Sequence, residues 1–214
     1  RLQPDTLGFS SATDRDSIST PGSLMEEIPP IPPPSALTLT RFLQLNLQKS
    51  QLAQASFGAE LKHYKTFIAL IQEPYINKRG SMPPRVAGTN VYKANKAARA
   101  AIMTSKDIRA WIMNEFTTPD VSTILWFTGD ATAPKVILCS WYADYKQPIL
   151  DPTVVNLVKY AELHHWPLIL GVDSNAHSTL WGGSENNPRG DALDGFIPQP
   201  HLSVENKGTD VTFD

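Results

Sequence analysis

The chain has 214 residues, a formal net charge of -2 and one cysteine. A single cysteine excludes a disulfide within the chain, and no stretch approaches the ~18 apolar residues that a membrane span needs. A net charge of -2 argues by itself against nucleic-acid binding. Cys139 lies in the apolar run Val136–Cys139, so we expect a buried, inert thiol in a soluble protein of a reducing, intracellular compartment.

The average charge conceals two halves of opposite sign. Residues 41–109 contain twelve Lys and Arg against three acidic residues, a balance of +9, whereas residues 110–214 balance to -8. A one-sided positive field can follow a phosphate backbone. An ordinary solvated surface is the alternative interpretation, and both stay open at this point.

The first part of the chain does not predict a folded domain. Residues 1–38 contain scattered Ser, Thr and Asp, little apolar periodicity and the proline-rich run Pro29–Pro34. They cannot bury enough apolar surface to offset the entropy of ordering. We expect a flexible linker with an extended proline run, followed by one domain over residues 39–214. A ligand for a proline-recognising domain is the alternative for this run.

Strands and helices alternate along the rest of the chain. The expected order is a strand at 39–46, a helix at 50–64, strands at 67–72, near 99–104, at 121–127 and at 135–142, a helix from Asp151, a strand at 167–172 and a short helix around Leu193, Phe196 and Ile197. Asp151 is expected to cap its helix, with Pro152 in the first turn. Elements interleaved in this way favour a layered α/β fold.

Three of the expected strands end in polar residues of similar kind. The first strand ends at Asn46, the second runs into Glu73, and the strand near 167–172 runs into Asp173 and Asn175. Sheets of α/β proteins present reactive groups where strands end. An isolated Asp-x-Asn is more often a turn, but three such strand ends indicate one shared site.

Five short motifs extend this pattern. They are Gln44–Ser50, Gln72–Tyr75, Ser140–Tyr142, Gly171–His177 with Trp181-Gly182, and Asn187–Gly190. In this order and spacing they resemble the endonuclease domain of non-LTR (LINE-type, jockey-like) retrotransposons, within the endonuclease/exonuclease/phosphatase superfamily. The resemblance covers residues from about 39 onward. It implies the DNase-I-like fold, an α/β four-layer sandwich of two sheets flanked by helices.

The resemblance implies a metal-dependent endonuclease that nicks target DNA for target-primed reverse transcription, with Mg²⁺ or Mn²⁺ as its cofactor. Glu73 would be the metal ligand, and Asn46 would join it as a ligand, orient its carboxylate or contact the phosphate. Asp173 would position or activate the attacking water, while Asn175 and Tyr142 would donate hydrogen bonds to the phosphate. Asn46 as a helix cap and Tyr142 as a core tyrosine are the structural alternatives.

DNA is the partner that the resemblance implies, and one exposed loop is the best candidate for contacting it. The loop follows the Glu73 strand, and its Gly and Pro residues mark it as exposed. Its three cations are Lys78, Arg79 and Arg85. His177 and Trp181 are further candidates for DNA contact, with packing as the alternative. The resemblance also implies a reverse transcriptase in the same polypeptide, no membrane partner, and action in the nucleus.

The family pattern continues past the last residues of this chain. Thr212 resembles the family's threonine near the site, and a further strand with an Asp and then a Ser-Asp-His motif would follow Phe213. The sequence ends at Asp214. We therefore expect the last strands and the catalytic His to be missing from this stretch, and its isolated activity to be poor, because a charge-stabilising donor is worth ~10²- to 10³-fold in rate.

Two other functions stay open from the sequence. The chain could be a catalytically dead or domesticated module of the same fold that binds DNA or protein without cutting it. It could also be a phosphoesterase of the phosphatase branch, acting on inositol phosphates or nucleotides. A magnesium-dependent nicking assay distinguishes the first alternative from an endonuclease, and competition by small phosphoesters distinguishes the second.

Overall fold

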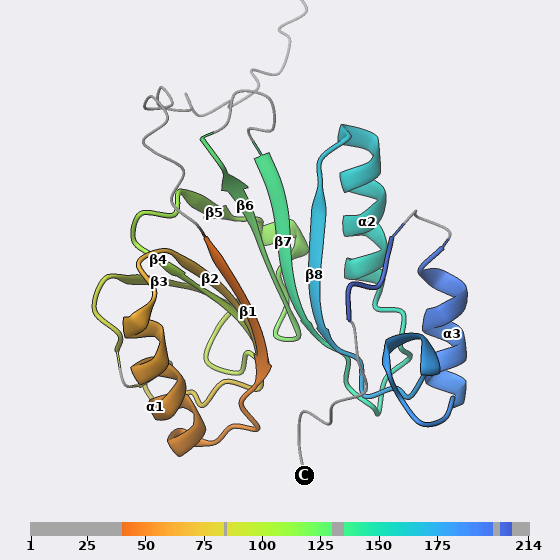
Figure 1. Ribbon diagram of the computed structural model, residues 1–214, viewed down its shortest axis with the longest axis horizontal. Coiled ribbons are helices and arrows are strands. Elements are labelled where there is room, and N and C mark those ends of the chain that lie inside the picture. The colour runs from red at the N-terminus through yellow and green to blue at the C-terminus, as the bar shows by residue number, and fades with distance from the viewer. Residues whose placement is uncertain (1–39, 84, 130–134, 199–201, 207–214) are drawn as a thin grey trace, which may run out of the picture. The chain divides into compact units, whose positions relative to one another are not determined.

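Two four-stranded sheets lie at the centre of the domain (Figure 1). The computed structural model describes residues 40–83, 85–129, 135–198 and 202–206. The strand order of the first sheet is β1 (Arg41–Asn46), β2 (Phe67–Gln72), β4 (Ala100–Ser105) and β3 (Thr89–Tyr92). β1 and β2 run parallel, and the other neighbours are antiparallel, so this sheet is mixed.

The second sheet repeats this arrangement. Its strand order is β5 (Ala110–Ile112), β6 (Val121–Phe127), β7 (Lys135–Tyr142) and β8 (Leu168–Asp173). The β7–β8 pair is parallel and the other two pairs are antiparallel. Each sheet therefore has one parallel pair, whose carboxyl ends lie at the same edge.

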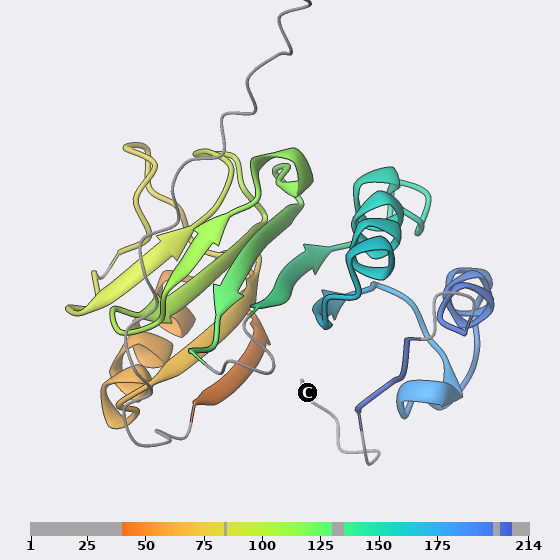
Figure 2. The same ribbon diagram turned by 90° about the horizontal axis from the view of Figure 1, so that it is seen from above.

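Helices cover the outer faces of the two sheets (Figures 1 and 2). They are α1 (Gln51–Glu60), α2 (Pro152–His164) and α3 (Pro188–Phe196), with 3₁₀ turns η1 (Leu61–His63), η2 (Asn114–Phe116) and η3 (Thr179–Trp181). α1 lies on the first sheet, and α2 and α3 lie on the side of the second. Among the residues that the structure describes, no helix is long and apolar enough to cross a membrane.

Local sequence signals explain where the helices begin. Ser50 accepts a hydrogen bond from the backbone N–H of Ala53 at the start of α1, and Asp151 accepts one from Thr153 at the start of α2. Pro152 occupies the first turn of α2, where its missing N–H costs no helical hydrogen bond. The capping and proline predictions for this helix are confirmed.

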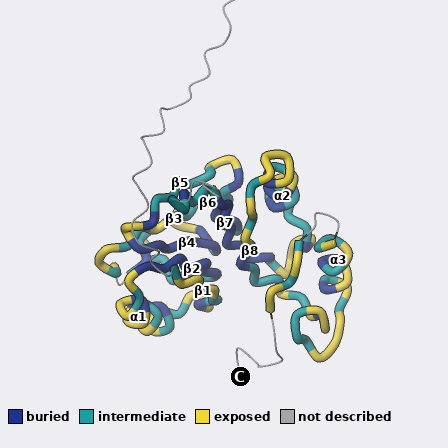
Figure 3. The backbone as a smooth tube through the Cα atoms, turned by 45° about the horizontal axis from the view of Figure 1, so that its top comes forward, coloured by how far each residue is buried: buried dark blue, intermediate teal, exposed yellow. Residues whose placement is uncertain are grey.

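Buried residues lie along the strands of both sheets (Figure 3). Apolar side chains fill the spaces between the layers of the sandwich. Ile68, Ile102 and Leu138 belong to the buried cluster between the two sheets. Phe57 of α1 packs on the outer cluster of the first sheet, and Leu157 of α2 is fully buried against the second. Burial of these side chains supplies the main favourable term in folding.

A buried polar contact fixes how the sheets meet. The side chain of Gln72, at the end of β2, is completely buried, and its Nε2 donates to the Ser140 hydroxyl and to the Gly171 carbonyl, both at 2.9 Å. The Ser140 hydroxyl donates back to the Ile71 carbonyl at 2.8 Å. Buried polar groups are costly unless they are paired, so these bonds select one alignment of β2 against β7 and β8.

The predicted two-sheet sandwich with outer helices is confirmed, and the predicted strand ranges 67–72, 121–127 and 135–142 agree with the structure. β3 and β5 were not predicted from the sequence. They lie at sheet edges, have four and three residues, and show too little alternation of apolar and polar residues to be recognised. Cys139 is completely buried, and burial raises the pKa of its thiol to about 12, as expected for an inert cysteine. The predicted linker at 1–38 lies outside the described residues.

A substitution at Gly171 tests whether β8 must lie this close to Leu70 of β2. A Cβ at this position would lie 2.6 Å from Leu70 Cδ1 and 2.8 Å from Leu70 Cβ. We expect Gly171→Ala to lower the free energy of unfolding by about 1–3 kcal/mol, because it overpacks the contact between β2 and β8. Urea unfolding measures the change. Gly195→Ala in α3 is the matched control, since its Cβ meets nothing within 4 Å; equal stability of the two variants would contradict the packing account.

Candidate active site

The carboxyl ends of both parallel pairs carry the predicted site residues. Asn46 pairs with Gln72 in the register of β1 and β2, so Glu73 lies next to Asn46. Tyr142 pairs with Asp173 in the register of β7 and β8. Because the sheets pack face to face, side chains from four strand ends meet at one place, as the sequence predicted for Asn46, Glu73 and Asp173.

Asn46 holds the two carboxylates together. Its Nδ2 donates to Glu73 Oε2 at 3.2 Å and to Asp173 Oδ2 at 2.5 Å. Its Oδ1 accepts from the backbone N–H of Gln48 at 2.7 Å. These partners fix the orientation of the amide, because carboxylates only accept and a backbone N–H only donates. The nitrogen faces the carboxylates, so the geometry favours an orienting role for Asn46 over the metal-ligand role that the sequence analysis allowed.

The backbone around Glu73 is strained. Glu73 has φ 46°, and Gln48 and Lys49 in the facing loop have φ 49° and 56°. Such conformations are uncommon for residues other than glycine, and they concentrate at functional sites. The loop is held by hydrogen bonds, since Lys49 N donates to the Glu73 carbonyl at 2.7 Å and Leu47 N to the Gln72 carbonyl at 2.8 Å. The Lys49 ammonium lies 3.2 Å from Glu73 Oε1, which places a cation at this carboxylate.

Tyr142 contributes a hydroxyl beside the carboxylates. The residue is 7% exposed, and its hydroxyl makes no hydrogen bond within the described part of the chain. Burial raises the pKa of this hydroxyl above its usual value, and the negative charge of Glu73 raises it further. Tyr142 therefore stays protonated at neutral pH and has a donor available for an acceptor placed at the site.

Arg99 links Tyr142 to two further carboxylates. Its Nε and Nη2 bond Asp120 at 2.5 and 2.6 Å, its Nη1 bonds Asp144 at 2.6 Å, and its guanidinium carbon lies 4.9 Å from the centre of the Tyr142 ring. Hydrogen bonding to Asp120 raises the pKa of Arg99. The backbone N–H of Lys146, together with Arg99, lowers the pKa of Asp144. None of these three residues was predicted as part of the site.

The motif Asn187–Gly190 organises the loops after β7 and β8. Asn187 caps α3 through Gly190 N at 2.8 Å and also accepts from His177 N at 3.2 Å. A Cβ at Gly190 would lie 1.8 Å from the His177 carbonyl oxygen, so only glycine allows this approach. Arg189 donates to the carbonyls of the loop at 143–147 and to that of Ser174.

Asn175 is positioned by the same loops. It has φ 45°, its Nδ2 donates to the Ala143 carbonyl at 3.2 Å, and its N–H donates to Asp173 Oδ1 at 3.3 Å. Arg189 Nη2 binds the same Ala143 carbonyl at 3.2 Å. Asn175 is exposed beside Asp173, and the second N–H of its amide is available to a ligand.

The comparisons with known proteins agree with this geometry. No family model matches the chain. Among solved structures, the endonuclease domain of TRAS1, a telomere-specific non-LTR retrotransposon, is 31% identical, with a TM-score of 0.68 over 82% of this chain and 77% of that one. This chain belongs to the non-LTR retrotransposon endonucleases. The match also confirms the predicted DNase-I-like sandwich.

A second relative is a much longer protein. The chain is 27% identical over 183 residues to a 115 kDa protein assigned to the type-1 retrotransposable element R1DM of Drosophila melanogaster. The match covers 81% of this chain and 17% of that protein, so the chain spans about a sixth of this relative.

The predicted DNA-contact loop of the endonuclease is exposed and well anchored. Lys78, Arg79 and Arg85 are exposed. The buried side chain of Gln54 on α1 bonds the backbone of Tyr75 and the carbonyl of Pro83. These bonds anchor the loop at Tyr75 and Pro83 without using its cations.

The other predicted contact residues have different environments. His177 is exposed, and its backbone is held by Asn187. Trp181 packs partly against the cluster under α3, and its Nε1 donates to the Ala176 carbonyl at 3.4 Å. Trp141 is 2% exposed and belongs to the core. Thr212 lies outside the described residues, so its predicted place near the site is not tested.

The residues of the endonuclease site suit a hard cation. Glu73 and Asp173 present carboxylate oxygens to the same amide group, and Mg²⁺ needs only one or two protein carboxylates because it keeps several waters. Within the described residues, no group of three or more His, Cys, Asp or Glu is arranged to hold a metal ion. Carboxylate oxygens are the kind of donor that a hard cation uses, whereas a structural zinc site uses thiolate or imidazole ligands.

A cavity of about 670 Å³ lies between β1, β8 and α3. It is lined largely by apolar residues, including Phe42, Ile169 and Phe196, and by Gln44 and Ser174 toward the site. Glu73, Asp173 and Asn46 are not among its lining residues. The carboxylates of the endonuclease site therefore do not line this cavity.

Replacing Arg189 tests whether its hydrogen bonds hold the loop at 143–147 in place. Replacing it with Lys removes most of its bonds to carbonyl oxygens, which we expect to cost about 1–3 kcal/mol of local stability. Cleavage by chymotrypsin after Tyr145, which is 62% exposed, should then be at least about fivefold faster. Arg79→Lys, on an exposed loop, is the matched control, and equal cleavage rates in both variants would contradict the assignment.

Proposed function

We propose that this chain is a Mg²⁺-dependent (or Mn²⁺-dependent) endonuclease that nicks duplex DNA and leaves a 3′ hydroxyl for target-primed reverse transcription. The observation that carries the proposal is the convergence of Glu73 and Asp173 on Asn46, with the Tyr142 hydroxyl beside them. Two carboxylates held this close repel each other, and a bound cation would relieve the repulsion.

Glu73 and Asp173 have different roles in the proposed hydrolysis. Glu73 would hold the metal ion, which supplies neutralisation of the scissile phosphate when bound. Asp173 positions a water and accepts its proton as the water oxygen forms a bond to phosphorus. The bond from phosphorus to the 3′ oxygen breaks, and that oxygen takes up a proton from solvent. This leaves a 5′ phosphate and a 3′ hydroxyl.

Two neutral donors stabilise the charge that develops on the phosphate. The Tyr142 hydroxyl donates to a non-bridging oxygen, and the exposed N–H of the Asn175 amide donates to the same phosphate. Their positions are set before substrate arrives, because Asn175 is tied to Ala143 and Tyr142 is packed under Arg99. Preorganised donors need little reorganisation during the reaction.

DNA binding follows from the division of charge between the two sheets. The basic residues 41–109 form the first sheet and its loops, and the boundary at 109 falls just before β5, the first strand of the second sheet. A positive half next to an open carboxylate site can follow a phosphate backbone past the reacting bond. The loop with Lys78, Arg79 and Arg85 extends from the strand that carries Glu73.

The context of the whole protein is also part of the proposal. The R1DM relative is a 115 kDa retroelement protein of which this chain matches a small part. We propose a reverse transcriptase in the same polypeptide and action in the nucleus, where target DNA lies. A phosphoesterase for small substrates is less well supported, because neither Glu73 nor Asp173 lines the cavity between β1, β8 and α3.

Glu73→Gln tests the metal-dependent chemistry. We expect it to abolish Mg²⁺-dependent nicking of supercoiled plasmid by the intact protein, because an amide is a poorer ligand for a hard cation. Mg²⁺ should also raise the melting temperature of the wild type and not that of the variant. The matched control is Glu60→Gln on α1, whose carboxylate accepts from the Tyr64 hydroxyl. Undiminished nicking by Glu73→Gln would exclude this mechanism.

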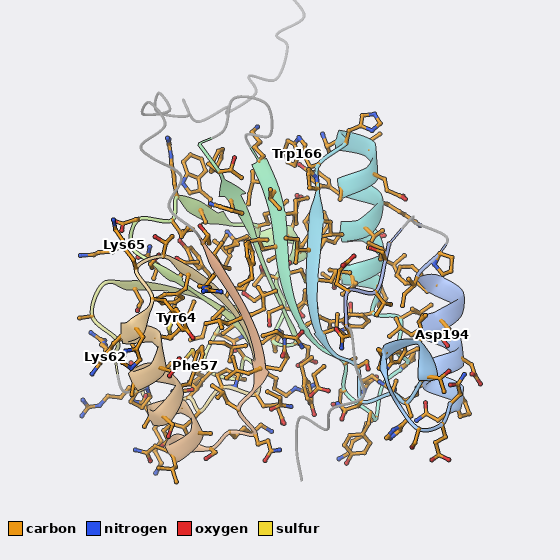
Figure 4. The ribbon with its side chains drawn as sticks, viewed as in Figure 1. Phe57, Lys62, Tyr64, Lys65, Trp166 and Asp194 are labelled. Carbon is orange, nitrogen blue, oxygen red and sulfur yellow. The ribbon has the colours of Figure 1, made fainter. Side chains whose placement is uncertain are left out.

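The basic loop gives a separate test of DNA contact. Neutralising Lys78, Arg79 and Arg85 together should weaken DNA binding and reduce the slope of log affinity against log salt by up to about 2.7, since each phosphate contact contributes ~0.9. Fluorescence anisotropy over a salt series measures the slope. Neutralising Lys62, Lys65 and Lys159 makes the same charge change away from the loop and should reduce the slope less, although the first two, labelled in Figure 4, belong to the basic half. If both triple variants change the slope equally, the loop has no specific role.

A further inference from the structure

We propose that Arg99 is a positioning residue that holds the Tyr142 hydroxyl against the scissile phosphate, acting through the ring of Tyr142 and not through the DNA. This inference rests on the proposed function. It adds a residue that neither the sequence pattern nor the comparisons assign to the site.

Arg99 spans the two sheets at the site. It directly precedes β4 in the first sheet, whereas Asp120 precedes β6 and Asp144 follows β7 in the second. Its fork binds both oxygens of Asp120 and one oxygen of Asp144. The guanidinium is thereby fixed on three sides, and the ring of Tyr142 packs against it at 4.9 Å.

The main chain ties the same residues to the metal-binding strand. The Arg99 carbonyl accepts from the N–H of Glu73 at 2.7 Å, and the Asp120 carbonyl accepts from the N–H of Tyr142 at 2.9 Å. Glu73 and Tyr142 are therefore each bonded to one partner of the Arg99–Asp120 ion pair. A shift of this pair changes the position of the hydroxyl relative to the carboxylate.

Arg99 is poorly suited to bind phosphate itself. Its side chain is 29% exposed, and all three of its nitrogens already bond carboxylate oxygens. Two carboxylates against one guanidinium leave the group with a net negative charge. Arg99 therefore acts through the planar geometry of its guanidinium, and lysine cannot bind two carboxylates at once in this way.

The expected consequence is a loss of kcat without a loss of DNA binding. A hydroxyl displaced by about 1 Å from its acceptor can cost up to ~10²-fold in rate. We expect Arg99→Lys to lower kcat by about 10-fold or more and to change KM for DNA by less than about threefold. Asp144→Asn, which keeps the Asp120 pair, should act in the same direction and less strongly.

The deciding experiment is a double-mutant cycle with Tyr142→Phe, measured by plasmid nicking with the intact protein. If Arg99 acts through the hydroxyl, Arg99→Lys should cost less than about twofold once the hydroxyl is absent. Arg109→Lys is the matched control, because this arginine also stacks on an aromatic ring, that of Phe127, at the end of the second sheet remote from Tyr142. It should leave kcat unchanged.

A second measurement, by ¹⁹F NMR, does not depend on nicking activity. With 3-fluorotyrosine incorporated, Arg99→Lys should shift the ¹⁹F resonance that Tyr142→Phe removes, and Arg109→Lys should not shift it. Two results would overturn the inference. One is an equal loss of kcat from Arg99→Lys with Tyr142 and with Tyr142→Phe. The other is a raised KM for DNA together with a reduced slope of log affinity against log salt. If Glu73→Gln remains active, the proposed function itself fails, so the two failures are distinguishable.

Discussion

The buried contact between Gln72 and the second sheet is the constraint on which the site depends. Gln72 bonds Ser140 and Gly171, and the absence of a side chain at Gly171 lets β8 approach Leu70 of β2. The next residue after Gln72 is Glu73, and two residues after Gly171 comes Asp173. Alignment of the sheets by one amide therefore places two carboxylates within reach of Asn46, although each comes from a different part of the chain.

Electrostatics then decides what the site can do. The carboxylates create a negative centre, while most of the positive charge lies in the first sheet and its loops. Arg99 is a cation of this half that reaches the second sheet, where it bonds Asp120 and Asp144 and stacks on Tyr142. The site thus combines a pair of carboxylates with a neutral hydroxyl donor, and the proposed phosphodiester hydrolysis would use both.

The sequence predicted the parts of the site that depend on local pattern. Apolar runs ending in Asn46, Glu73 and Asp173 follow strand periodicity, so both the strands and their convergence were expected. Arg99 was not, because its partners at 120 and 144 become neighbours only through sheet pairing. The orientation of Asn46 also required the structure, since the N–H of Gln48 reaches its oxygen only in the strained turn that follows β1.

Iron-directed cleavage of the backbone tests the central claim most directly. Fe²⁺ replaces Mg²⁺ in the protein, ascorbate and peroxide generate radicals at the metal, and mass spectrometry identifies the cut positions. The account predicts cuts clustered near Asn46, Glu73, Tyr142 and Asp173, four positions distant in sequence, and their suppression by excess Mg²⁺ or by Glu73→Gln. Cuts concentrated elsewhere, or cuts that magnesium does not suppress, would contradict a single metal site at these strand ends.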